Sequence, residues 1–73
     1  MSKEIILEII AKELNLYGYS EDFIMHSAQF ARDNPEALKL LRNWYISDSV
    51  GDRRYMIKQL NEMLDIDSKI SGI

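Results

Sequence analysis

Residues 33–46 read DNPEALKLLRNWYI, and the first three letters of this stretch separate two helices. A residue that precedes proline avoids the helical region of backbone space, so a helix that arrives at Asp33 has to end there. Proline is well tolerated in the first position of a helix, because its missing N–H would have had no partner there. The Asn34 side chain can accept from the free N–H groups of that first turn. We therefore expect one helix to end near Asp33 and another to run from Pro35 to about Ile46.

Two earlier helices are predicted by the same kinds of signal. Ser2 can cap a helix over residues 3–16, and Ser20 can cap a helix over residues 21–33. Gly18 lies between them, where a left-handed residue commonly closes a helix, because glycine lacks the Cβ that makes positive φ costly.

A fourth helix is expected over about residues 50–65. Its possible caps are Ser47, Ser49 and Asp52, of which Ser49 or an earlier residue is favoured, with Gly51 in the first turn or just before it. Residues 68–73 then form a flexible tail beyond a single helical domain of residues 1–67. The apolar positions at helical spacing, which we expect to face the core, are Ile5, Ile6, Ile9, Ile10 and Leu14 in the first helix and Met56, Ile57, Leu60, Met63 and Leu64 in the fourth. Short connections favour antiparallel neighbours, so the predicted fold is all-α, a compact three- to four-helix bundle.

The composition restricts the chemistry of this domain. There is no cysteine among the 73 residues, so neither a disulfide nor a thiolate zinc site can form, and His26 is the only imidazole. Ser27 follows His26 directly, and consecutive helical residues do not face each other as a nucleophile and its base must. No glycine-rich phosphate-binding motif is present. We therefore expect no enzyme activity, no catalytic residue, no cofactor and no metal.

Membrane and targeting segments are not expected either. Uninterrupted apolar runs reach only three residues, as in Ile5-Ile6-Leu7, which is far short of a membrane span. Charges near the N-terminus interrupt any signal-peptide core. These features favour a cytoplasmic protein, and the initiating Met1 leads us to expect a complete small gene product.

The segment 39–58 differs in character from the rest of the chain. It holds five cations and two acids, a net charge of +3, whereas the whole chain carries a formal net charge of −3. Arginine, tryptophan and tyrosine are the residue types most enriched in the hot spots of protein interfaces. The candidate partner-binding residues are Arg42, Trp44, Tyr45, Arg53, Arg54, Tyr55 and Lys58.

These residues predict a small non-catalytic protein-binding module or regulator, similar in size and character to inhibitors and antitoxins. Its binding face would lie across the third and fourth helices, and its partner would be a protein with an acidic surface. Arg53 and Arg54 would make charge-assisted contacts. Tyr55, Trp44 or Tyr45 would supply the buried anchor.

Three other interpretations remain open. In the first, the cations are ordinary solvated side chains, and Trp44 and Tyr45 lie in the core. Alternatively, the wide apolar arcs on the first and third helices serve a homo-oligomer. Finally, residues 10–24 are similar to the first helix, turn and second helix of a helix-turn-helix protein, which would make the chain a small nucleic-acid-binding regulator. The net acidic charge, together with Glu21 and Asp22 at the start of the would-be recognition helix, disfavours that function.

Overall fold

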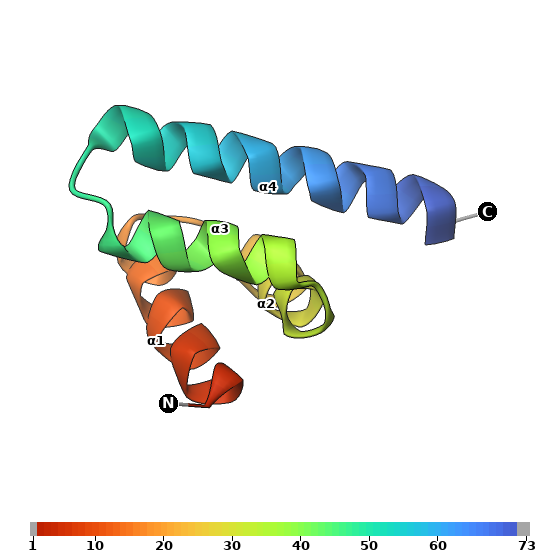
Figure 1. Cartoon of the computed structure of the whole chain (residues 1–73), viewed down its shortest axis with the longest axis horizontal. Helices are drawn as coiled ribbons and strands as arrows, with labels where there is room; N and C mark the ends of the chain where they lie inside the picture. Colours follow the sequence, from red (N-terminus) through yellow and green to blue (C-terminus); the bar gives the residue numbers. More distant parts are fainter. Residues whose placement is uncertain (1, 72–73) are drawn as a thin grey trace.

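The computed structural model describes residues 2–71 and the side chains of residues 2–67. It contains four helices, α1 (Lys3–Leu16), α2 (Glu21–Asp33), α3 (Pro35–Ile46) and α4 (Val50–Ser71). Helix α3 contacts each of the other three helices, and α4 lies antiparallel alongside it (Figure 1). The prediction of an all-α helical bundle is confirmed.

Side-chain caps define where the helices begin. A side-chain oxygen accepts a hydrogen bond from an N–H in the first turn of every helix, at Ser2, Ser20, Asn34 and Ser49. The Asn34 cap is bidentate, because its Oδ1 accepts from Glu36 N at 3.1 Å and from Ala37 N at 3.2 Å. The predicted bounds of the first three helices and the predicted start of the fourth are confirmed.

The end of the fourth helix was predicted wrongly. Helix α4 continues to Ser71 instead of ending near residue 65, so a tail beginning at residue 68 is not observed. The amphipathic pattern does fade after Leu64, but no glycine or proline follows until Gly72, and a formed helix can propagate through residues of moderate propensity. Residues 72–73, also assigned to the tail, lie outside the described part of the chain.

The turn between α1 and α2 depends on Gly18, which has a positive φ of 88°. Its N–H bonds to the Asn15 carbonyl at 3.1 Å, and the Tyr19 N–H bonds to the Leu14 carbonyl at 3.2 Å. This pair of bonds is the Schellman arrangement, which satisfies the last carbonyls of a helix through a left-handed residue. It also brings Tyr17 and Tyr19 back over the bundle.

We expect Gly18→Ala to destabilise the fold by about 1 kcal/mol, because an L-residue at this φ is strained. A new Cβ would meet no atom within 4 Å, so steric clash does not contribute. Gly51→Ala is the matched control, since Gly51 lies inside α4 without a positive φ and alanine there should stabilise by up to about 1 kcal/mol. Urea unfolding of both variants measures the difference, and an equal shift in both would contradict the argument.

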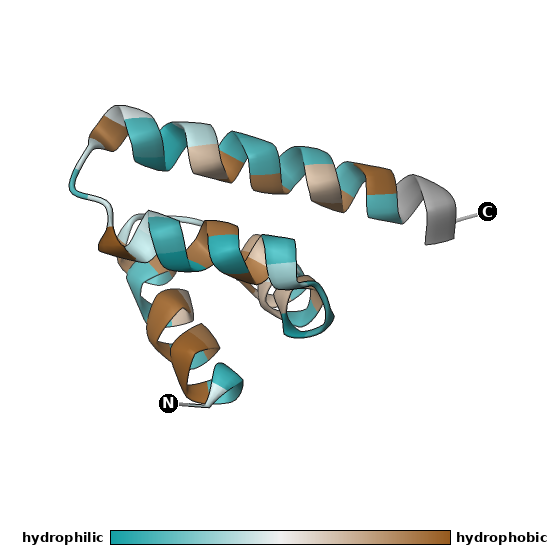
Figure 2. Ribbon diagram, in the orientation of Figure 1, coloured by the Kyte–Doolittle hydropathy of each residue, from teal (hydrophilic) through white to brown (hydrophobic). Residues whose placement is uncertain are grey.

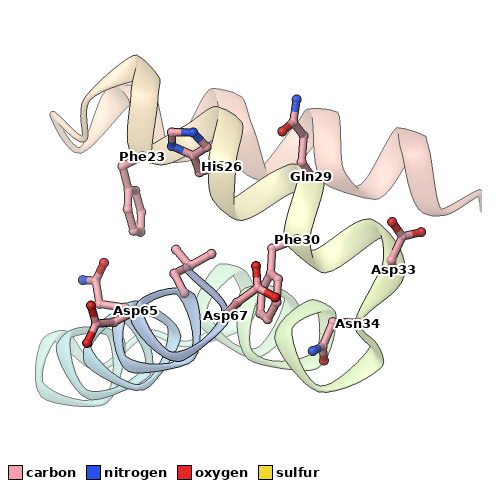
Figure 3. Close-up of a pocket in the computed structure, with 10 residues that line it drawn as sticks. Phe23, His26, Gln29, Phe30, Asp33, Asn34, Asp65 and Asp67 are labelled. Carbon is pink, nitrogen blue, oxygen red and sulfur yellow. The ribbon is translucent and has the colours of Figure 1, made fainter. Parts of the chain in front are cut away.

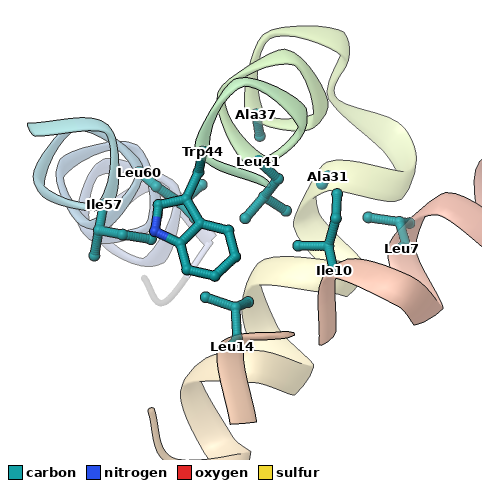
Figure 4. Close-up of a cluster of buried hydrophobic side chains, with 9 residues drawn as sticks. All are labelled: Leu7, Ile10, Leu14, Ala31, Ala37, Leu41, Trp44, Ile57 and Leu60. Carbon is teal, nitrogen blue, oxygen red and sulfur yellow. The ribbon is translucent and has the colours of Figure 1, made fainter. Parts of the chain in front are cut away.

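The core lies where α1, α2 and α4 pack around α3. Its buried apolar residues are Leu7, Ile10, Leu14, Ala31, Ala37, Leu41, Trp44, Ile57 and Leu60 (Figure 4). Figure 4 shows the Trp44 indole at the centre of this cluster, between Leu14 and the α4 residues. Ser27 is also fully buried, and its hydroxyl donates to the Ile24 carbonyl at 3.0 Å.

The predicted inner face of α1 needs correction, whereas that of α4 is confirmed. Leu7, Ile10 and Leu14 make the buried stripe of α1, while Ile5 is 49% exposed. Paired isoleucines allow the apolar stripe of the helix to be centred in two ways, and packing against α2 and α3 selects the one that includes Leu7. All the predicted stripe residues of α4 are buried or packed against the core.

Candidate functional site

A pocket opens at the end of the bundle where the α1–α2 turn approaches the connection between α3 and α4. Its volume is about 690 Å³. We call it the end pocket, and its lining residues are Tyr17, Tyr19, Trp44, Tyr45, Ile46, Ser47, Asp48, Val50, Arg53 and Arg54. Figure 2 shows the apolar residues on both sides of this corner, at the end of α3 and the start of α4.

Aromatic rings form one wall of the end pocket. The Tyr17 and Trp44 ring centroids are 5.5 Å apart with an interplanar angle of 76°, and Tyr19 meets Trp44 at 6.5 Å and 78°. Both are edge-to-face contacts, in which the positive edge of one ring meets the negative face of another. The α1–α2 turn is therefore attached to α3 through Trp44.

Arg53 holds this wall to the end of α3. Its Nε donates to the Ser47 carbonyl at 2.7 Å, and its guanidinium also donates to the Tyr45 carbonyl at 3.2 Å and to the Tyr17 hydroxyl. The guanidinium carbon lies 5.0 Å from the ring centroids of both Tyr17 and Trp44. A cation at the C-terminus of a helix satisfies free carbonyls and complements the helix dipole. Arg53 thus links α4 to α3 and to the α1–α2 turn.

Two of the predicted binding residues make their observed contacts within the chain, and a partner-binding role for either stays a prediction. Trp44 is only 2% exposed, so its ring is part of the core and is not offered to a partner as an anchor. The guanidinium of Arg53 donates its hydrogen bonds to groups within the chain, so its observed contacts stabilise the fold. Tyr45 and Arg54 do line the end pocket from exposed positions, as a binding role requires.

The other three predicted residues lie outside the end pocket. Tyr55 is 62% exposed and lies about 200° around α4 from the buried Ile57, which places it on the outer face. Lys58 is exposed and lines a neighbouring pocket of about 490 Å³, which Arg54 also borders. Arg42 is exposed on α3. The structure therefore brings Arg53, Arg54, Trp44 and Tyr45 together, joins Lys58 to their edge, and separates Arg42 and Tyr55 from them.

Sequence reasoning missed the most exposed apolar side chains of the end pocket. Ile46 is 76% exposed, Val50 68% and Tyr17 58%. A signal was present in the sequence. Each of these large apolar residues lies at a turn or a helix end, outside the apolar stripes that the helical periodicity predicts to face the core. Their convergence depends on the tertiary fold, since Tyr17 is distant in sequence from the other two.

The described side chains hold few groups suited to chemistry. No cluster of three or more histidine, aspartate or glutamate residues among them is placed to bind a metal ion. His26 is exposed on α2, away from the end pocket. At the start of α2, Glu21 and Asp22 are exposed, while Arg32 near its end lies 3.9 Å from Glu4. The surface of α2 is therefore poorly suited to phosphate contacts.

Comparison of the chain with models of known protein families, with curated proteins and with solved structures finds no match. Among the described residues, none of the helices has both the length and the apolar character needed to cross a bilayer.

Proposed function

We propose that this chain is a non-catalytic protein-binding module, and that its partner inserts an apolar side chain into the end pocket. The observation that carries the proposal is the exposure of Ile46 and Val50, 76% and 68%, beside a pocket walled by aromatic rings. Large apolar side chains gathered around a concave surface favour association, since burying them removes apolar area from water. A rigid aromatic wall loses little side-chain entropy on binding.

Charge supports a partner with acidic groups near its apolar anchor. Arg54 is exposed at the edge of the end pocket, where Arg53 and Arg54 outnumber Asp48 among the described lining residues. Lys58 is exposed one turn further along α4. Arg54 and Lys58 both lie in the segment 39–58, whose five cations and two acids contrast with the acidic remainder of the chain. Such an asymmetry steers an acidic partner to this end of the molecule and repels nucleic acid from the rest of it.

Affinity capture from nuclease-treated lysate of the native cell, followed by titration of the recovered protein in purified form, tests this function. We expect Ile46→Glu and Arg54→Glu each to weaken binding about tenfold or more, because one removes apolar contact and the other reverses the rim charge. Met25→Glu is the matched control, since Met25 is 53% exposed on α2 and lies outside the end pocket.

Two results would contradict the proposal. One is recovery of nucleic acid alone, with binding that falls steeply as salt rises. The other is equal loss of binding in Met25→Glu and Ile46→Glu, which would show that the end pocket is not the contact surface.

A further inference from the structure

A second concave surface lies between α2 and the C-terminal half of α4. It is an open groove of about 890 Å³. Phe23 and Phe30 of α2 and Leu64 of α4 are partly buried against the core and give it an apolar floor. Figure 3 shows the two phenylalanine rings extending from α2 toward α4. We call this surface the acidic groove, for the charges described next.

Among the residues described at the acidic groove, the charged side chains are aspartates, and the imidazole of His26 lines the groove as well. Asp33, Asp65 and Asp67 border it, and none of its described lining residues is lysine or arginine. These carboxylates and the other described acids form no cluster suited to a metal ion. An apolar floor beneath carboxylates matches a ligand that is both apolar and cationic.

The spacing of the floor residues indicates the shape of that ligand. Phe23 and Phe30 are seven residues apart on one helix, which is two turns or about 10 Å along the axis. A helix lying in a groove presents its anchors at i, i+3 or i+4, and i+7, with the same spacing. We propose that the acidic groove binds a basic amphipathic helix of a second protein, with its apolar side chains over Phe23, Phe30 and Leu64 and its cations near Asp33 and Asp67.

This proposal does not depend on the function of the end pocket. Among their described lining residues, the two surfaces have opposite net charge and no residue in common. If both are occupied, the module joins an acidic partner to a basic one.

The test uses a fluorescein-labelled helical peptide of about 16 residues, long enough for four turns, with leucines at i, i+4, i+7 and i+11 and flanking lysines. One matched peptide has glutamate in place of every lysine, and another has alanine in place of every leucine. By fluorescence anisotropy in about 0.1 M salt, we expect either matched peptide to bind at least about tenfold more weakly than the first.

Variants of the protein place the peptide in the acidic groove. Asp33→Asn/Asp67→Asn should weaken binding about tenfold, since it removes two carboxylates from the rim. It should not unfold the domain, because Asp33 ends α2, where a negative charge opposes the helix dipole. Glu4→Gln/Glu8→Gln makes the same change in net charge on exposed side chains of α1 and should leave the affinity within about twofold. Arg54→Glu, which alters the end pocket, should not weaken binding.

Three results would overturn the proposal. Equal affinity for the lysine and glutamate peptides, or equal loss in both double variants, would exclude specific recognition at the groove. Self-association of the wild type in sedimentation velocity that Asp33→Asn/Asp67→Asn abolishes would show that a second copy occupies the groove.

Discussion

Trp44→Ala is expected to leave about half or more of the molecules unfolded at 25 °C. Trp44 is 2% exposed and is the largest of the fully buried side chains. Removing a buried aromatic side chain costs about 3–5 kcal/mol, which combines the lost transfer free energy with the cavity left behind. A single core in a domain of this size supplies about 3–5 kcal/mol of net stability. The two quantities are equal within their precision, so the free energy of unfolding should fall to about zero and about half of the molecules should be unfolded.

The loss should be large because Trp44 contacts several elements of the bundle at once. Its ring contacts Tyr17 and Tyr19 from the α1–α2 turn and lies 5.0 Å from the Arg53 guanidinium of α4. Removing it therefore detaches the turn and loosens α4 from the end of α3. The aromatic and cation–π contacts of Trp44 are lost together with its buried area, so the cost should lie toward the upper end of that range.

Far-UV circular dichroism with urea unfolding measures this prediction. Tyr45→Ala is the control at the neighbouring position, and since Tyr45 is 38% exposed it should cost at most about 1 kcal/mol. Trp44→Phe should fall between the two, because it keeps an aromatic ring of smaller volume. A Trp44→Ala variant that unfolds with the midpoint and cooperativity of Tyr45→Ala would contradict the assignment of Trp44 to the core.

The helix boundaries were predictable because the signals that set them are local. Asn34 and Pro35 act on the backbone of their immediate neighbours, and Gly18 provides a φ of 88° that other residues reach only with strain. The end of α4 was not predictable in this way, since no breaker occurs between Leu64 and Gly72. The end of an apolar stripe shows where a helix stops packing against the core. The backbone hydrogen bonds of the helix can continue beyond that residue.

The candidate binding site was only partly predictable, because rotation about a helix axis decides which of two adjacent residues faces the core. Arg53 and Arg54 are neighbours in an RR pair, yet Arg53 bonds to the end of α3 while Arg54 is exposed. Trp44 and Tyr45 divide between core and surface in the same way. Consecutive helical residues differ by about 100° around the axis. The sequence therefore identifies such a pair, but only the packing of the helix decides which of the two residues is buried and which is exposed.

Arg53→Ala is expected to destabilise the fold by about 2–3 kcal/mol, even though arginine is usually a surface residue. The side chain donates to two backbone carbonyls and to the Tyr17 hydroxyl. A hydrogen bond to a charged group contributes about 1.5–3 kcal/mol when it is well buried. Arg53 is partly exposed, so we expect its three hydrogen bonds together to contribute no more than about one such buried bond. The cation–π contacts with Tyr17 and Trp44 add about 0.5–1 kcal/mol. Arg54→Ala should change stability by less than about 0.5 kcal/mol.

Urea unfolding of the two alanine variants measures the contrast between these adjacent arginines, and Arg53→Lys identifies its origin. A lysine keeps the charge but cannot span two carbonyls and a hydroxyl with the planar geometry of a guanidinium, so it should recover less than half of the loss. Full recovery by lysine would show that charge near the α3 C-terminus is what matters, and equal effects at both positions would refute the structural role of Arg53. Because Arg53 supports the fold, a charge reversal of both arginines would mix unfolding with loss of binding. Arg54→Glu alone is the variant that probes the end pocket.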